Sequence, residues 1–198
     1  MNRLAFLPTL ALAAGLLAGC AGPQTRYYSL AEPAAAPAQV APPAGPPLFI
    51  ELAPLALPER LARPQMVVRQ SGAGAQVEVL EQHRWASSFE SELRDALAAG
   101  IAARLGAVDV TQGGRAGGGP AWRIAVQVRQ FDAVEGSRVD AALSWTIRRS
   151  GDASSTACQW SASEPAGAGI DALAQGAQRL TGRAAEAIAR HLAAVAAA

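Results

Sequence analysis

Two stretches in which apolar and polar residues alternate limit the folds open to this chain. Tryptophan, isoleucine and valine alternate with arginine and glutamine over residues 122–129, and the same period of two returns over residues 139–148. Because successive side chains of a strand point to opposite faces, each such strand buries one face only. Gly136 separates the two stretches, Gly151 follows the second, and residues 154–162 are again strand-like. The pattern predicts an antiparallel sheet with one buried face.

Two amphipathic helices are predicted to cover that face. Apolar residues recur at four-residue spacing from Phe89 to Leu105, and Gly106 is expected to end this helix. Ser87 is predicted to cap its start, with Glu90 three residues later completing a capping box. The second helix is predicted over about residues 170–195, which carry an apolar stripe.

The order of these elements predicts the fold class. Three more strand-like stretches, residues 48–52, 65–69 and 76–80, precede the first helix. Strands, helix, strands, helix is the order of an α+β two-layer sandwich, with a mostly antiparallel sheet and two amphipathic helices packed on one face. The other face is expected to be wet or to meet a partner, and it carries Arg123, Gln127, Arg129, Asp140, Thr146 and Arg148.

The first twenty residues have the features of a lipoprotein leader. The apolar run from Leu4 to Leu17 is too short to span a bilayer, and it ends in Ala18-Gly19-Cys20, which matches the bacterial lipobox. Cys20 is therefore predicted to carry a diacylglycerol thioether and, after cleavage, an N-acyl chain, which together make a stable membrane anchor. Ala21, rather than an aspartate, follows; by resemblance to bacterial lipoproteins this favours the periplasmic face of the outer membrane. An ordinary signal peptide with an incidental cysteine is the alternative.

Three parts of the chain are predicted. Residues 1–19 are the lipoprotein signal peptide. Residues 20–47 contain the lipidated cysteine, a short strand near Arg26–Leu30 and an alanine- and proline-rich stretch that is expected to be an extended tether or a loop without a role. Residues 48–198 form a single α+β domain, since about 180 residues after the leader suffice for one hydrophobic core.

The residues offer little chemistry for catalysis. All 17 basic residues are arginines and the net charge is +1, so neither lysine-based catalysis nor nucleic-acid binding is indicated. There are two histidines, and no metal-ligand spacing or nucleophile motif accompanies them. The glycine-rich residues 113–119 lack the lysine of a phosphate-binding loop. His191 is interpreted as structural, and Cys158 as a small buried residue rather than a reactive thiol. We expect no enzyme activity, no metal and no cofactor apart from the covalent lipid.

Three segments carry a resemblance to a known family. They are Tyr27-Tyr28-Ser29-Leu30 soon after the lipobox, Leu61-Ala62-Arg63-Pro64-Gln65-Met66-Val67-Val68-Arg69, and Glu81-Gln82-His83-Arg84-Trp85-Ala86. In this order they resemble the auxiliary lipoproteins of ABC-type lipid transport systems, the PqiC-like family. The resemblance implies a non-catalytic accessory subunit of the outer membrane that partners an MCE-domain periplasmic protein in moving lipid between the two membranes. The alanine- and proline-rich stretch departs from the family pattern and is expected to lengthen the reach from the membrane.

The same segments supply the candidate partner-binding residues. Pro64 cannot donate to a strand ladder and marks a strand edge that could dock a partner. Two structural alternatives stay open: Arg63 could pair with Glu59, and Trp85 could pack on Phe89 in the core. The candidates are Arg63, Pro64, Gln65, Arg69, Arg84 and Trp85.

Two other functions remain open from the sequence. A small anchored α+β domain also suits a regulator or assembly factor of envelope machinery, such as a peptidoglycan synthase activator. A lipid carrier would need an apolar pocket between sheet and helices large enough for acyl chains. The sequence demands no homo-oligomer but leaves one open.

Overall fold

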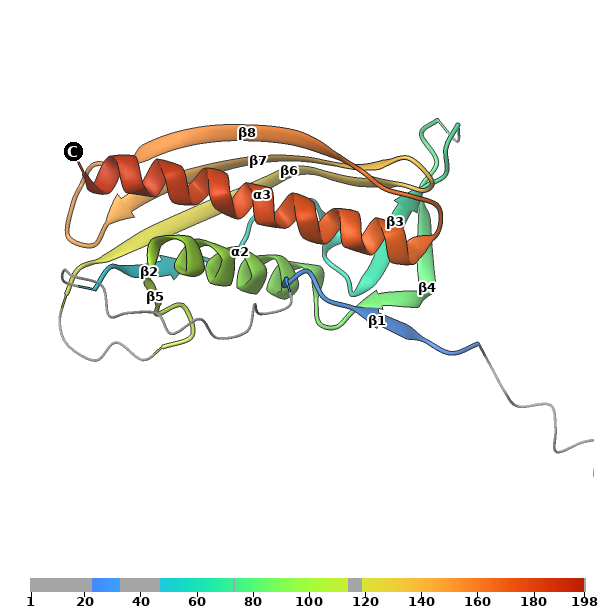
Figure 1. Ribbon diagram of the computed structural model, residues 1–198, viewed down its shortest axis with the longest axis horizontal. Coiled ribbons are helices and arrows are strands. Elements are labelled where there is room, and N and C mark those ends of the chain that lie inside the picture. The colour runs from blue at the N-terminus through green and yellow to red at the C-terminus, as the bar shows by residue number, and fades with distance from the viewer. Residues whose placement is uncertain (1–22, 33–46, 73, 114–118, 198) are drawn as a thin grey trace, which may run out of the picture.

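The computed structural model describes residues 23–32, 47–72, 74–113 and 119–197. The leader with Cys20, most of the alanine- and proline-rich stretch and most of the glycine-rich stretch lie outside these residues. The described elements are β1 (Arg26–Tyr28), β2 (Phe49–Leu52), the short 3-10 helix η1 (Glu59–Leu61), β3 (Gln65–Arg69), β4 (Glu78–Trp85), α2 (Phe89–Leu105), β5 (Val108–Asp109), β6 (Ala121–Val134), β7 (Arg138–Arg149), β8 (Thr156–Pro165) and α3 (Ile170–Ala196) (Figure 1).

The long strand β6 organises the sheet. One edge of β6 pairs antiparallel with β7 over nearly its whole length, and β7 pairs in the same way with β8. The other edge is divided: β2 pairs with its first residues and β3 with its last two, both in parallel. β5 extends the β2 branch, and β4 and then β1 extend the β3 branch. The result is one eight-stranded, mostly antiparallel sheet that forks on one side of β6.

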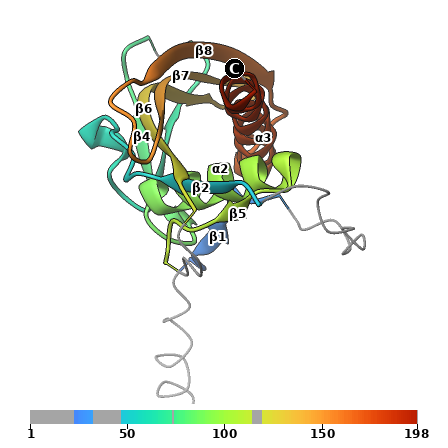
Figure 2. The same ribbon diagram turned by 90° about the vertical axis from the view of Figure 1, so that its left-hand side faces the viewer.

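Both helices lie on the concave side of this curved sheet (Figure 2). The predicted alternation is confirmed, since the inward residues of β6 and β7 are buried while their neighbours are exposed or half-buried. The four-residue spacing in α2 buries Phe89, Leu93, Leu97 and Ile101, and α3 buries a matching stripe. A large apolar side chain fully removed from water contributes about 1.5–3 kcal/mol, so this layer supplies the main stabilisation. The predicted α+β sandwich with helices on one sheet face is confirmed.

The cap of α2 lies one residue later than predicted. Ser88, not Ser87, accepts the hydrogen bond of the Ser91 backbone N–H at 3.1 Å. The Glu90 carboxylate, expected in a capping box, instead accepts the Leu55 backbone N–H at 2.9 Å. Adjacent serines are equally good caps, and the sequence cannot choose between them. In the structure Ser88 is the cap, and the helix begins at Phe89, whose side chain is buried. The end of α2 at Gly106, with a left-handed φ of 59°, is as predicted.

The folded unit begins before residue 48. β1 pairs in parallel with β4, with Tyr28 opposite Trp85, so residues 26–28 belong to the same sheet. The alanine- and proline-rich stretch therefore comes after the first docked strand, not between the anchor and the body. For this reason it cannot lengthen the reach from Cys20, and that expectation was wrong. Only residues 21–25 separate Cys20 from β1.

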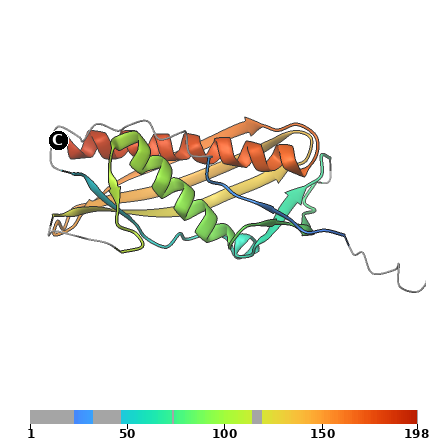
Figure 3. The ribbon, with the colours of Figure 1, turned by 60° about the horizontal axis from the view of Figure 1, so that its bottom comes forward.

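The two helices touch where α2 crosses α3 (Figure 3). A Cβ atom added to Gly100 would lie 2.8 Å from the Cβ of Ala185, which is closer than two such carbons can approach. Ala185 is itself fully buried on α3. Glycine at this position therefore sets the distance between the helices, although it is a poor helix former.

Gly100→Ala is expected to destabilise the fold by about 1–3 kcal/mol, because overpacking outweighs the gain in helix propensity. The free energy of unfolding in urea measures this. The matched control is the exchange variant Gly100→Ala/Ala185→Gly, which moves the methyl group across the contact and should recover most of the loss. If Gly100→Ala alone were more stable than the native chain, the close contact between Gly100 and Ala185 would be contradicted.

Candidate functional site

The predicted partner-binding residues gather mainly at one corner, where β3 begins and β4 ends. Gln65 lies opposite Arg84, and the Trp85 backbone N–H donates to the Pro64 carbonyl at 2.7 Å. Gln65 and Arg84 both donate to the Glu81 carboxylate, at 3.3 and 3.2 Å. These polar side chains and the exposed ring of Pro64 form a surface.

The other predicted residues lie differently. Trp85 is 5% exposed, with its ring centroid 5.8 Å from that of Phe89, so it packs in the core and offers a partner almost no surface. Arg69 lies at the far end of β3, where it donates to the Gly74 carbonyl at 3.2 Å. Arg63 forms no pair with Glu59 in the described part of the chain, and its Nε is buried there without a hydrogen-bond partner.

A cluster that the sequence did not reveal fixes β1 to the body. The Tyr28 hydroxyl donates to the Asp171 carboxylate at 2.6 Å and lies 2.8 Å from Nδ1 of His83. Because the hydroxyl has one proton and donates it to Asp171, Nδ1 of His83 must be the donor of the second bond. The Tyr28 and His83 rings also stack, with centroids 5.8 Å apart. These residues are 55 and 143 positions apart in the chain, so no local pattern could have linked them.

The cluster shifts the pKa of two of its members in opposite directions. Burial, then the hydrogen bond to Asp171, raises the pKa of the Tyr28 phenol above its ordinary value. The hydrogen bond from Tyr28 lowers the pKa of Asp171, and Arg26 at 3.3 Å adds to this effect. Both shifts favour the pair in which a neutral phenol donates to a carboxylate.

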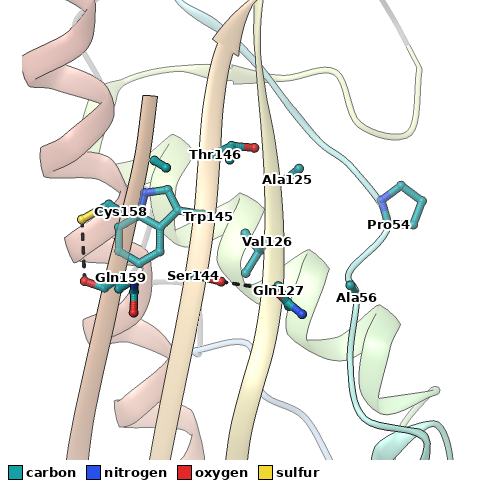
Figure 4. A pocket seen from close by; sticks show the side chains of 11 residues that line it. Pro54, Ala56, Ala125, Val126, Gln127, Ser144, Trp145, Thr146, Cys158 and Gln159 are labelled. Atoms are coloured by element: carbon teal, nitrogen blue, oxygen red, sulfur yellow. Dashed lines mark hydrogen bonds between the residues drawn. The ribbon is translucent and has the colours of Figure 1, made fainter. Parts of the chain in front are cut away.

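The face of the sheet turned away from the helices carries a groove of about 650 Å³ (Figure 4). Pro54 has no N–H for the ladder, so β2 ends before it, and the chain then follows β6 to a single bridge between Ala56 and Gln127. This segment forms one wall. The floor comes from small or uncharged outward residues of three strands, which are Ala125, Gln127, Ser144, Thr146, Ala157 and Gln159. We call this the outer groove.

The outer groove continues along the strands into a second hollow of about 520 Å³. Gln159 lines both, and Arg129 donates to its side chain at 3.3 Å. The expectation that this face stays free of helices is confirmed. Because the floor has no charged side chain, the groove suits a partner with a weakly polar surface.

The strand β8 borders the outer groove as an open edge. In the described residues it pairs with β7 alone, so its other side carries unpaired backbone groups. Two arginines of α3 cover its end: Arg179 donates to the Glu164 carboxylate at 2.7 Å, and Arg183 donates to the Ser163 carbonyl at 3.1 Å. The Arg179 hydrogen bond lowers the pKa of Glu164. These arginines leave the outer backbone edge of the uncharged residues 156–162 uncovered.

The remaining candidate residues have structural roles. His191 accepts the Trp145 indole N–H on Nδ1 at 2.9 Å, which confirms the structural interpretation. Cys158 is half-buried rather than buried, because it lies on an edge strand. No group of three or more metal-ligating side chains occurs within the described part of the chain. No helix there is both long and apolar enough to cross a bilayer.

One crevice lies between the sheet and the helices, and it has little free space. The crevice between β3, α2 and α3 has a volume of about 20 Å³, enough for about one water molecule. An acyl chain does not fit into it. The pocket that a lipid carrier would need between the two layers is not present at this crevice, so the carrier hypothesis loses its main support.

These features define a class of protein: a small α+β domain with a strand docked close behind its amino-terminal segment and a grooved, open sheet face. The model of a family described as ABC-type transport auxiliary lipoprotein component matches residues 28–189. The chain belongs to this family, so the resemblance found in the sequence is confirmed. It is thus a lipoprotein of the cell envelope, of a family associated with ABC-type transporters.

Solved structures share the fold. An uncharacterized protein superposes with a TM-score of 0.66 at 19% identity, covering 85% of this chain and 99% of its own. A Xanthomonas campestris protein of the DUF330 family superposes with a TM-score of 0.56 at 16% identity, covering 74% of this chain and 85% of its own. At such identities the likeness shows the fold alone. No curated protein matches the chain in sequence.

Tyr28→Phe is expected to remove the tyrosine ionisation that occurs at a raised pKa. In the native chain one of two tyrosines should ionise above the ordinary value of about 10. Because the folded pKa of Tyr28 is raised, its stabilising contribution is complete below about pH 10 and is lost as pH rises through the folded pKa. For Asp171, whose folded pKa is lowered, the contribution is present above about pH 4 and is lost as pH falls through the folded pKa.

Tyrosinate absorbance recorded against pH measures the ionisation of the tyrosines. The matched control is Tyr27→Phe, which should leave the high transition in place. Identical titration curves for the two variants would contradict the Tyr28–Asp171 bond.

Proposed function

We propose that this protein is a non-catalytic accessory subunit of an ABC/MCE-type system that carries lipid between the two bacterial membranes. It is held at the periplasmic face of the outer membrane by diacylglycerol and N-acyl chains on Cys20. The observation that carries the proposal is the family match, which runs from Tyr28 in β1 to Ala189 in α3 and so spans the described fold. The lipobox at Cys20 supports the anchor.

The mechanism proposed is docking by the outer groove. An uncharged floor next to an open, uncharged edge resembles the centre of a protein–protein interface, where charged side chains are depleted. The open edge of β8 could also take an added strand from the partner. The occupant that we propose is an MCE-domain periplasmic protein of the same transporter. The corner formed by Pro64, Gln65 and Arg84 remains a second candidate contact.

The first prediction of this proposal concerns the lipid anchor on Cys20. Native chain should incorporate radiolabelled palmitate and sediment with outer membranes after density-gradient separation. Cys20→Ala should lose the label and leave the membrane fraction, because only the acyl chains hold the domain there. Cys158→Ser is the matched control and should keep both properties. Label in the inner-membrane fraction only would refute the outer-membrane assignment.

The second prediction of this proposal concerns the outer groove. Ala125→Arg should weaken co-purification of the MCE-domain protein at least about tenfold, or about 1.4 kcal/mol, since the buried guanidinium would have no partner. Ala103→Arg, on an exposed position of α2, is the matched control and should bind normally. Equal binding by both variants would exclude the groove as the contact. Recovery of cell-wall synthases without any MCE-domain protein would favour the alternative role as a regulator of envelope machinery.

A further inference from the structure

The two tyrosines of the chain are adjacent, and they point to opposite sides of β1. Tyr28 points toward the body and is held there by Asp171 and His83. Tyr27 points away and is 66% exposed, the largest exposure among the big apolar side chains of the described residues. A strand alternates its side chains, so fixing Tyr28 inward necessarily fixes Tyr27 outward.

Several contacts hold this segment in place. Besides the Tyr28 cluster, Arg26 pairs with Asp171 at 3.3 Å. Just after β1, the Ser29 hydroxyl and the Leu30 backbone N–H both donate to the Glu92 carboxylate, at 2.9 and 3.0 Å. The direction of Tyr27 is therefore set by the folded domain.

The short chain between anchor and β1 limits where the domain can lie. Tyr27 follows Cys20 by seven residue steps, and even a fully extended chain spans only about 24 Å over them. The strand β6 alone, with its 14 residues, is about 46 Å long. The amino-terminal end of β1 lies at the end of the molecule where α3 begins, while β5 and the end of α3 lie at the other (Figure 1). An anchor on Cys20 thus keeps the β1 end, rather than the β5 end, next to the bilayer.

We infer that the β1 end of the domain faces the bilayer and that Tyr27 lies in its headgroup region. Tyrosine suits this place because its ring is apolar and its hydroxyl is polar, and tyrosines are enriched at membrane–water interfaces. The positive charge beside it does not oppose the contact, because Arg26 is paired with Asp171. The inference rests on the lipid anchor of the proposed function. The lining of the outer groove includes no residue of β1, so this contact does not use the groove.

Labelling of tyrosine in the lipidated full-length chain tests this. The chain is reconstituted in zwitterionic vesicles of phosphatidylcholine and phosphatidylethanolamine, and it is treated with 4-diazobenzenesulfonate, a small charged reagent that modifies exposed tyrosines. The variant Val108→Tyr places a tyrosine on β5, at an exposed position of the opposite end. Flotation reports vesicle binding, and mass spectrometry of peptides reports the labelling of each tyrosine.

The expected result is that the chain floats, that position 108 is labelled and that Tyr27 is protected several-fold. In the unanchored Cys20→Ala chain Tyr27 should be labelled as readily as position 108. Equal labelling of both positions on floating vesicles would overturn the membrane contact while leaving the anchor intact. Protection of Tyr27 in the Cys20→Ala chain would also overturn it, since a second copy would then cover the ring. Failure of the native chain to float would refute the anchor and the inference together.

Discussion

The pairing of β6 with strands on both of its edges is the constraint on which the rest of the structure depends. Its inward residues form the centre of the core, and β7 and β8 repeat its alternation on one side. On the other side β6 serves two branches, because β2 ends at Leu52 before Pro54 and leaves the later part of the edge to β3. Through this fork β1, the outer groove and the open β8 edge belong to one sheet.

The β1 end, the outer sheet face and the interior of the domain differ in what they can contact. One end holds β1 through the Tyr28–Asp171 bond and so receives the short link from the lipobox cysteine. The sheet face away from the helices supplies a groove with an uncharged floor. The interior, by contrast, is filled by helices that approach closely at Gly100 and Ala185, with little space for a ligand in the crevice beside α2 and α3. A tethering and docking protein fits this arrangement better than a lipid carrier.

Prediction from sequence succeeded where the signal was local. Alternation located β6 and β7, four-residue spacing located α2, and Gly106 marked its end. It failed at the start of α2, where the structure uses Ser88 as the cap and not the adjacent Ser87. For Trp85 the sequence left open a partner contact and core packing on Phe89, and the structure shows the core packing. The outer groove could be expected only as a polar sheet face, since its wall depends on a single bridge between Ala56 and Gln127.

The sequence by itself determined the lipobox, the class of fold and the family, because short-range periodicity and ordered motifs carry these. Only the tertiary structure decided that β1 belongs to the domain, since its partners His83 and Asp171 lie far along the chain and meet it only in the folded protein. That pairing changed the meaning of the alanine- and proline-rich stretch from a tether to a segment between two docked strands. It also set the distance between anchor and domain, because chain length counts only up to the first residue that the fold holds in place.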